Sequence, residues 1–172
     1  ARVLENMNVE LAKVHRSRGF WHTVIKDKRA AFADYSEAIK ADPNNPNAYN
    51  ARGLIFLALE SYERAIADFS ESIRLAPKSH FVWRNRAGAH RANGDPDKAI
   101  ADYGAAIKHD PNDARGWRNR GMMHLFKNEN KKGAADYDKA LAQRDSDKAN
   151  LEAQQAKRLR REMRQRGKLH GG

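Results

Sequence analysis

The chain has 172 residues and a formal charge of +11, and only 40% of its residues are hydrophobic. The absence of cysteine excludes disulfides and thiol chemistry and fits either the cytoplasm or the periplasm. No apolar run is long enough to cross a bilayer, and no signal peptide is visible. The first residue is Ala1 rather than Met, which fits a processed protein or a fragment. We expect a soluble protein, and the sequence does not distinguish between the two compartments.

Apolar spacing predicts a first helix that ends near Val24, with residues 1–11 as its N-terminal extension or as the tail of a segment cut away upstream. A second helix is expected over 28–41, because the residue before Pro43 disfavours helix. Pro46 then suits the first position of the next helix. No segment alternates with a period of two, so no strand is expected anywhere in the chain.

One pattern then recurs every 34 residues. Its aromatic, small and proline positions are Tyr35, Phe69, Tyr103 and Tyr137; Ala31, Ala65, Ala99 and Gly133; Pro43, Pro77 and Pro111. A period of this length is typical of helix–turn–helix arrays. The chain resembles the tetratricopeptide-repeat family, although arginine takes the seventh position of each repeat, where the family has leucine. The resemblance implies an all-α fold, a right-handed α-solenoid of helix–turn–helix repeats, that binds protein partners.

The resemblance also implies one domain over residues 1–172 with four repeats and two ends. The parts are a helix extension (1–11), a degenerate first repeat (12–45), three further repeats (46–79, 80–113 and 114–147), a basic capping helix (148–166) and a frayed tail (167–172). The capping helix is expected as a ninth helix, since a solenoid needs a polar-faced cap over its last repeat. Self-association by end-to-end stacking of exposed terminal repeats is a further hypothesis.

Arginine and aspartate form two columns in register through the four repeats. Partly buried charges are nearly always paired, so the columns predict ion pairs between the two helices of each repeat. The residues given this structural role are Arg52, Arg86 and Arg120 with Asp68, Asp102 and Asp136, and Arg18 with Asp34 in the first repeat. We therefore do not assign these arginines to ligand binding.

In the family, the first helix of each repeat lines a concave groove. Carried over by position, the resemblance implies the partner-binding residues Arg16, Asn50, Arg84, Asn85, Arg91, Arg115, Arg118, Asn119 and Met122. The groove so assembled contains no aspartate or glutamate. We expect its partner to be an extended acidic peptide or a segment with a free C-terminal carboxylate. The alternative is a solvated basic face whose partner binds at an edge.

The C-terminal stretch 157–168 contains seven lysines or arginines and one glutamate. It suggests an alternative function, the binding of nucleic acid or an anionic surface, beside the simpler role of cap and solubilising charge. His22, His90 and His124 share one column, but we interpret them as packed side chains rather than metal ligands. No phosphate loop, nucleophile elbow or paired-carboxylate site is recognisable. We expect no catalysis, no metal and no cofactor.

Overall fold

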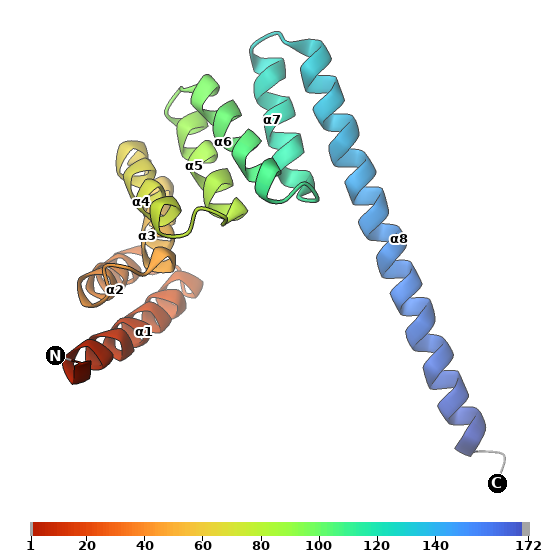
Figure 1. Ribbon diagram of the computed structural model, residues 1–172, viewed down its shortest axis with the longest axis horizontal. Helices are drawn as coiled ribbons and strands as arrows, with labels where there is room; N and C mark the ends of the chain where they lie inside the picture. The colour runs from red at the N-terminus through yellow and green to blue at the C-terminus, as the bar shows by residue number, and fades with distance from the viewer. Residues whose placement is uncertain (1, 170–172) are drawn as a thin grey trace. The chain divides into compact units, whose positions relative to one another are not determined.

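The computed structural model describes residues 2–169, over which it has eight α-helices and no strand (Figure 1). The helices are α1 (Arg2–Val24), α2 (Lys28–Ala41), α3 (Pro46–Ala58), α4 (Tyr62–Leu75), α5 (His80–Ala92), α6 (Pro96–His109), α7 (Ala114–Phe126) and α8 (Asn130–Leu169). Contacts divide the chain into two compact units, Ala1–Pro111 with α1 to α6 and Asn112–Gly172 with α7 and α8. The all-α class predicted from the sequence is confirmed. Among the described residues, no helix combines the length and apolar character needed to span a bilayer.

Unit 1 consists of three helix hairpins, α1–α2, α3–α4 and α5–α6, and unit 2 has a fourth, α7–α8. Within unit 1, α2 packs against α3 and α4 packs against α5. Each hairpin turn contains one residue in the left-handed region, and these four residues are 34 apart. They are Lys26 (φ 64°), Glu60 (φ 57°), Gly94 (φ 82°) and Asn128 (φ 60°). Only glycine adopts this conformation without a steric cost.

The helix boundaries follow local signals in the sequence. The Asp27 side chain accepts a hydrogen bond from the Ala30 amide at the start of α2, at 3.0 Å. Asn45 caps α3 in the same way, and Pro46 occupies the first turn of that helix. The two caps pair backbone N–H groups of the first turn, which have no partner within the helix. Pro46 has no N–H group and therefore needs no such partner.

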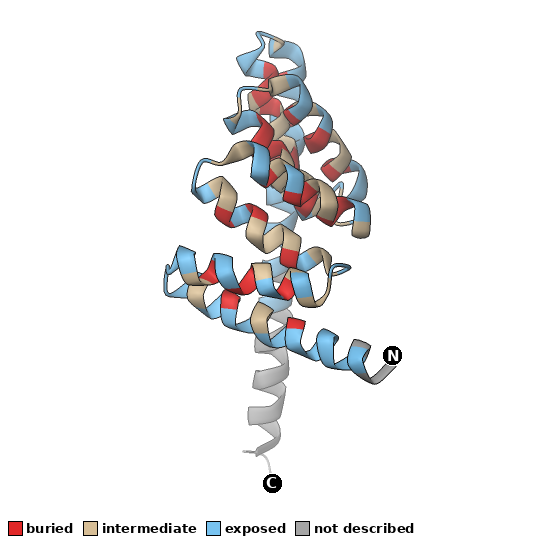
Figure 2. Ribbon diagram, turned by 90° about the vertical axis from the view of Figure 1, so that its left-hand side faces the viewer, coloured by how far each residue is buried: buried red, intermediate tan, exposed pale blue. Residues whose placement is uncertain are grey.

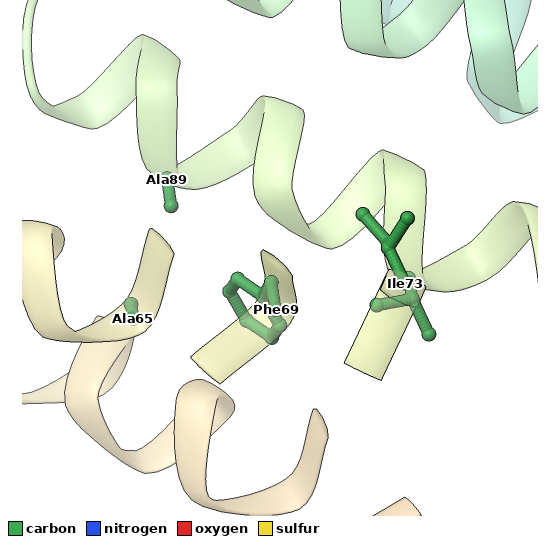
Figure 3. Close-up of a cluster of buried hydrophobic side chains, with 5 residues drawn as sticks. Ala65, Phe69, Ile73 and Ala89 are labelled. Atoms are coloured by element: carbon green, nitrogen blue, oxygen red, sulfur yellow. The ribbon is translucent and has the colours of Figure 1, made fainter. Parts of the chain in front are cut away.

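The core of unit 1 lies between successive hairpins. Ala65, Phe69 and Ile73 of α4 pack with Val82 and Ala89 of α5, and each is at most 7% exposed (Figure 3). Figure 2 shows that buried positions alternate with exposed ones along the helices, as expected for a structure in which each helix buries only one stripe. Within unit 1, each repeat therefore covers the apolar face of its neighbour.

The C-terminal region differs from the prediction of a ninth helix. Residues 148–166 belong to α8, a single helix of 40 residues that extends beyond the hairpin with α7 (Figure 1). The first three repeats end at a proline, but Asp145 stands at the corresponding position of the fourth, so nothing stops the helix. The side chains described from 144 to 151 are all exposed, and this part of α8 caps nothing within its unit. The tail expected to be frayed is helical to Leu169, and 170–172 lie outside the described residues.

Paired charges join the two helices of every hairpin. The Nε and Nη2 atoms of Arg86 donate to Asp102 at 2.7 and 2.8 Å. The structure has the same forked pair between Arg18 and Asp34, Arg52 and Asp68, and Arg120 and Asp136, as the two columns predict. All four aspartates are at most 6% exposed. Such bidentate pairs fix the geometry of both groups as well as neutralising them.

The arginine of each pair has further partners. The Arg86 guanidinium lies over the Trp83 ring at 4.9 Å, and its Nη1 donates to Ser70 of the preceding hairpin at 3.0 Å. Arg52 likewise lies over Tyr49 and donates to Ser36 at 3.5 Å. One side chain thus ties together two helices of its own repeat and one helix of the repeat before.

The helices of a hairpin cross closely because small residues stand at the crossing. A Cβ atom on Gly53 would lie 2.8 Å from Cε1 of the buried Phe69. In unit 2, a Cβ on Gly121 would lie 3.0 Å from the carbonyl oxygen of Gly133. Gly88, by contrast, has open space where its Cβ would be. The glycine requirement is therefore steric at the crossings and absent at Gly88.

Gly53→Ala is expected to lower the free energy of unfolding by about 1–3 kcal/mol, because the added methyl overpacks the contact with Phe69. Gly88→Ala is the matched control and should raise it by up to about 1 kcal/mol, since alanine favours helix over glycine. Urea unfolding followed by circular dichroism measures both. If both substitutions stabilised the protein, the close approach of α3 and α4 at Gly53 would be contradicted.

Arg86→Met is expected to cost about 3–5 kcal/mol of folding free energy, because it leaves the buried Asp102 without its charged partner. The control is Arg74→Met, which removes an exposed ion pair with Glu71 and should change stability little. Chemical unfolding of the two variants beside the wild type provides the comparison. Similar losses from both would show that the Arg86 pair is no more important than a surface pair.

Candidate functional site

Two adjoining clefts lie between α1 and α3 in unit 1, with volumes of about 460 and 440 Å³. Phe20, Tyr35 and Ala51 line both of them, so we treat the pair as one feature, the α1–α3 groove. Leu54 adds to the apolar floor of the second cleft. Concave sites with an apolar floor and a few polar groups are the usual form of a ligand or peptide site.

The charged residues that line the α1–α3 groove are all basic. Arg16 lines the first cleft, Lys26 and Lys28 line the second, and neither cleft has an aspartate or glutamate in its lining. The Lys28 ammonium donates to the Ala58 carbonyl at 3.2 Å, which holds it at the edge of α3. Such a site attracts carboxylates because its cations have no acidic neighbour within the lining.

Aromatic side chains stand exposed at the first cleft. Phe20 is 57% exposed and Trp21 is 64% exposed, and their rings meet edge to face with centroids 5.9 Å apart. Exposed large aromatic residues grouped at a cleft commonly mark contact surfaces, since their burial by a partner is favourable. This pair gives the groove an apolar contact beside Arg16.

A hydrogen bond links the groove to α5. The Asn85 Nδ2 atom donates to Asn50 Oδ1 at 2.9 Å, so side chains of two successive repeats are held together. Asn50 also lines the second cleft. Arg84, next to Asn85 on α5, is half-buried, and Arg91 is exposed in the last turn of α5. Amide side chains of this kind can both donate to and accept from an extended backbone.

The structure thus brings Arg16 and Asn50 to the groove and attaches Asn85 to Asn50. The other predicted partner-binding residues, Arg115, Arg118, Asn119 and Met122, lie on α7 in unit 2. Arg115 and Arg118 are exposed and line a separate cleft of about 340 Å³. Asn119 and Met122 are half-buried on the same helix.

Several residues that line the groove are not among those expected from the sequence, and they include Tyr35, Lys26, Lys28 and Trp21. Tyr35 is an aromatic signpost of the repeat, and Lys26 and Lys28 belong to a turn and to the start of α2 rather than to the first helix of a repeat. Trp21 carries a detectable signal, because the equivalent positions in the next two repeats hold the buried residues Ile55 and Ala89. A large aromatic residue in a column of buried smaller ones indicates a changed environment.

The histidine column joins the charge pairs. The Nε2 atoms of His22, His90 and His124 lie 3.6, 3.7 and 3.9 Å from the paired aspartates Asp34, Asp102 and Asp136. Each histidine therefore lies beside an aspartate that an arginine already neutralises. Over the described part of the chain, no group of three acidic or histidine side chains is placed to hold a metal ion.

Comparison with known families decides the identity of the repeats. The family model for the tetratricopeptide repeat matches residues 27–80 and 84–149, which is more than half of the chain. The chain belongs to the tetratricopeptide-repeat family. This confirms the resemblance noted from the 34-residue pattern. No curated protein sequence resembles the chain closely enough to count as a match.

Solved structures with the same fold are numerous. A crystal structure of MamA has a TM-score of 0.78 at 18% identity and covers 80% of this chain and 81% of its own. The Arabidopsis OM64 tetratricopeptide-repeat domain has a TM-score of 0.67 at 23% identity, with coverages of 69% and 98%. The first such domain of Spaghetti (RPAP3), bound to the HSP90 peptide SRMEEVD, has a TM-score of 0.67 at 20% identity, with coverages of 68% and 93%. These likenesses support the fold.

The environment of His90 makes the stability of unit 1 depend on pH. Burial lowers the pKa of His90, against the opposing attraction of Asp102, and the positive charges of Arg86 and Lys98 lower it further, while Asp95 opposes the shift. The folded protein therefore holds this imidazole neutral more firmly than the unfolded chain does. As the pH falls below 6.5, the unfolded state takes up a proton first, and stability is lost.

His90→Phe introduces the residue that the second repeat has at this position, Phe56. The variant is expected to lose less unfolding free energy than the wild type between neutral pH and the pH at which the folded imidazole protonates, because it has no imidazole to protonate at this site. Urea unfolding over a pH series gives the dependence of the unfolding free energy on pH for both proteins. An equal dependence in the variant and the wild type would contradict the lowered pKa of His90.

Proposed function

We propose that this chain is a protein-interaction module that binds an extended acidic peptide segment in the α1–α3 groove. The observation that carries the proposal is the lining of the groove, where Arg16, Lys26 and Lys28 surround an apolar floor without an acidic residue. Repeat arrays of this kind use extended surfaces along successive repeats for recognition. The fold and the charge of the site thus favour the same class of ligand.

One structural neighbour adds support for the class of ligand. The RPAP3 domain is bound to the peptide SRMEEVD, whose sequence contains two glutamates and one aspartate. At 20% identity the likeness extends only to the fold. The acidic ligand of this chain is therefore proposed from the residues of its own groove.

In the proposed complex, the Arg16 guanidinium forms a forked pair with a peptide carboxylate, because its planar donors match the two carboxylate oxygens. Lys26 and Lys28 attract a second acidic group as point charges. Asn50 and Asn85 are held by their mutual hydrogen bond and exchange hydrogen bonds with the peptide backbone. Because this bond already holds Asn50 and Asn85, little further ordering of these two side chains accompanies binding.

An apolar peptide side chain completes the proposed contact. Phe20 and Leu54 are 57% and 42% exposed, and both line the groove. Their burial beneath a peptide removes apolar surface from water and fixes the register of the segment. Arg84 and Arg91 of α5 belong to the same proposed surface. Arg115, Arg118, Asn119 and Met122 are proposed partner-binding residues of unit 2.

Arg16→Glu is expected to weaken binding of a fluorescein-labelled SRMEEVD peptide by about tenfold or more, because a charge-assisted pair is lost and a repulsion introduced. Arg29→Glu is the matched control, since Arg29 is exposed on α2, lines neither cleft and gives the same change in net charge. Fluorescence anisotropy at fixed salt measures both affinities. Equal weakening by both variants would show that peptide affinity depends on the net charge of the protein and not on Arg16 in the groove.

A peptide in which glutamine and asparagine replace the acidic residues tests the ligand side of the pair. This neutral peptide should bind the wild type more weakly than SRMEEVD does. Its affinities for the wild type and for Arg16→Glu should be nearly equal. The alternative function through the basic stretch 157–168 is tested with the same probes and a DNA duplex, using a chain cut after Asp147. Peptide affinity that disappears with the cut would contradict the groove and favour the C-terminal helix.

A further inference from the structure

The two clefts of the α1–α3 groove follow one another along the helices. The first cleft is lined by Arg16 of α1 and Asn47 of α3. The second is lined by Thr23 and Ala58, which come later in the same two helices. The two helices therefore run in the same direction along the groove. Since the clefts share part of their lining, one extended peptide can pass through both.

The middle of the groove is its apolar part. Phe20 and Leu54 are equivalent residues of successive repeats, 34 positions apart, so they stand at the same level along α1 and α3. Tyr35 and Ile55 also line the second cleft, and both belong to a buried core cluster. The apolar floor is therefore built on the folded core and exists before a ligand binds. It suits an apolar side chain of the ligand, because contact removes both surfaces from water.

A cation stands at each end of this apolar part. Arg16 lines the first cleft and precedes Phe20 by four residues, which is about 6 Å along the helix. At the other end, the Lys28 ammonium donates to the Ala58 carbonyl at 3.2 Å. Ala58 follows Leu54 by four residues, again about 6 Å along the helix. The groove therefore presents a positive charge, an apolar floor and a second positive charge, in that order.

The acidic side chains nearest in the sequence are engaged elsewhere. Asp27 caps the start of α2, and Asp34 forms the buried pair with Arg18. Glu37 accepts from Lys40 at 2.6 Å. Helix α3, the other wall of the groove, contains no aspartate or glutamate. The two cations of the groove are therefore available to carboxylates of a ligand.

We infer that the groove recognises an alternating motif in an extended peptide. The motif is an acidic residue, an apolar residue two positions on and a second acidic residue two positions further. Alternate residues of an extended chain point to the same side and lie about 6.6 Å apart, which matches the separation of the three levels of the groove. The inference rests on the proposed function and specifies the ligand of the same site.

Each part of the motif has its own contact. One carboxylate pairs with Arg16 and the other with Lys28, while the intervening apolar side chain lies against Phe20 and Leu54. The two residues between them point away from the groove and are not selected. Because the motif reads the same in both directions, it does not fix the polarity of the peptide. Both acidic groups are side chains, so a free C-terminus is not required.

Two fluorescein-labelled peptides of identical composition test the order of the residues. The first, TSETLTETS, contains the motif, and the second, TSEETTLTS, has its two glutamates adjacent and its leucine displaced. Threonine favours the extended conformation in both, and both end in an amide, so neither has a terminal carboxylate. In fluorescence anisotropy at fixed salt, the alternating peptide is expected to bind the full chain about tenfold more tightly. Since the two peptides carry equal charge, general attraction to this basic protein contributes equally to both affinities.

Two variants of the groove test whether this preference arises there. Lys28→Gln and Leu54→Ser should each weaken binding of the alternating peptide and leave that of the rearranged peptide nearly unchanged. The matched controls are Lys40→Gln and Leu59→Ser, because both residues are exposed and line neither cleft. Both controls should keep the wild-type preference. Circular dichroism establishes that all four variants keep their helical content.

The outcomes distinguish the motif from the proposed function. Equal affinities of the two peptides for the wild type, both weakened by Arg16→Glu, would overturn the motif and leave the acidic-peptide function standing. A preference that Lys28→Gln and Leu54→Ser leave undiminished would also overturn the motif. If neither peptide bound, or if Arg16→Glu weakened neither, the proposed function and the motif would both be overturned.

Discussion

The forked arginine–aspartate pair between the two helices of a repeat is the interaction on which the rest of the structure depends. In each pair the aspartate is buried, so its charge is tolerated only because the guanidinium neutralises it at hydrogen-bonding distance. In the second and third repeats the arginine also reaches a serine of the preceding hairpin. Hairpin closure and stacking of neighbouring hairpins are therefore linked through one side chain.

In unit 1, this interaction distinguishes the arginines that stabilise the fold from those that can bind a ligand. Arg18, Arg52 and Arg86 are engaged by carboxylates. Arg16, only two residues from Arg18 on α1, lines the first cleft of the groove, whose lining contains no carboxylate. Since α-helical residues two apart point in different directions, the fold itself sorts them into a structural and a binding face.

Much of this organisation could be predicted because each repeat carries its own signals. Pro43 and Pro46 predict the end of α2 and the start of α3, and the two charge columns predict the pairs. The continuous α8 differs from the separate capping helix expected over 148–166, because Asp145 stands where the other repeats have a proline and no signal in the sequence ends the helix there. The groove residues Lys26 and Lys28 escaped prediction because they depend on how a turn packs in three dimensions.

The most direct measurement is a nitrogen-15 NMR titration with an acidic peptide, followed at the three tryptophan indole signals. Trp21 lines the groove, whereas the Trp83 indole donates to the Pro77 carbonyl at 2.8 Å on another part of unit 1. If the peptide binds in the α1–α3 groove, the Trp21 indole signal and the side-chain amide signals of Asn50 and Asn85 shift and reach a plateau as the protein is saturated. The Trp83 indole signal stays unchanged. Shifts confined to Trp117 or to residues 148–169 would contradict the account.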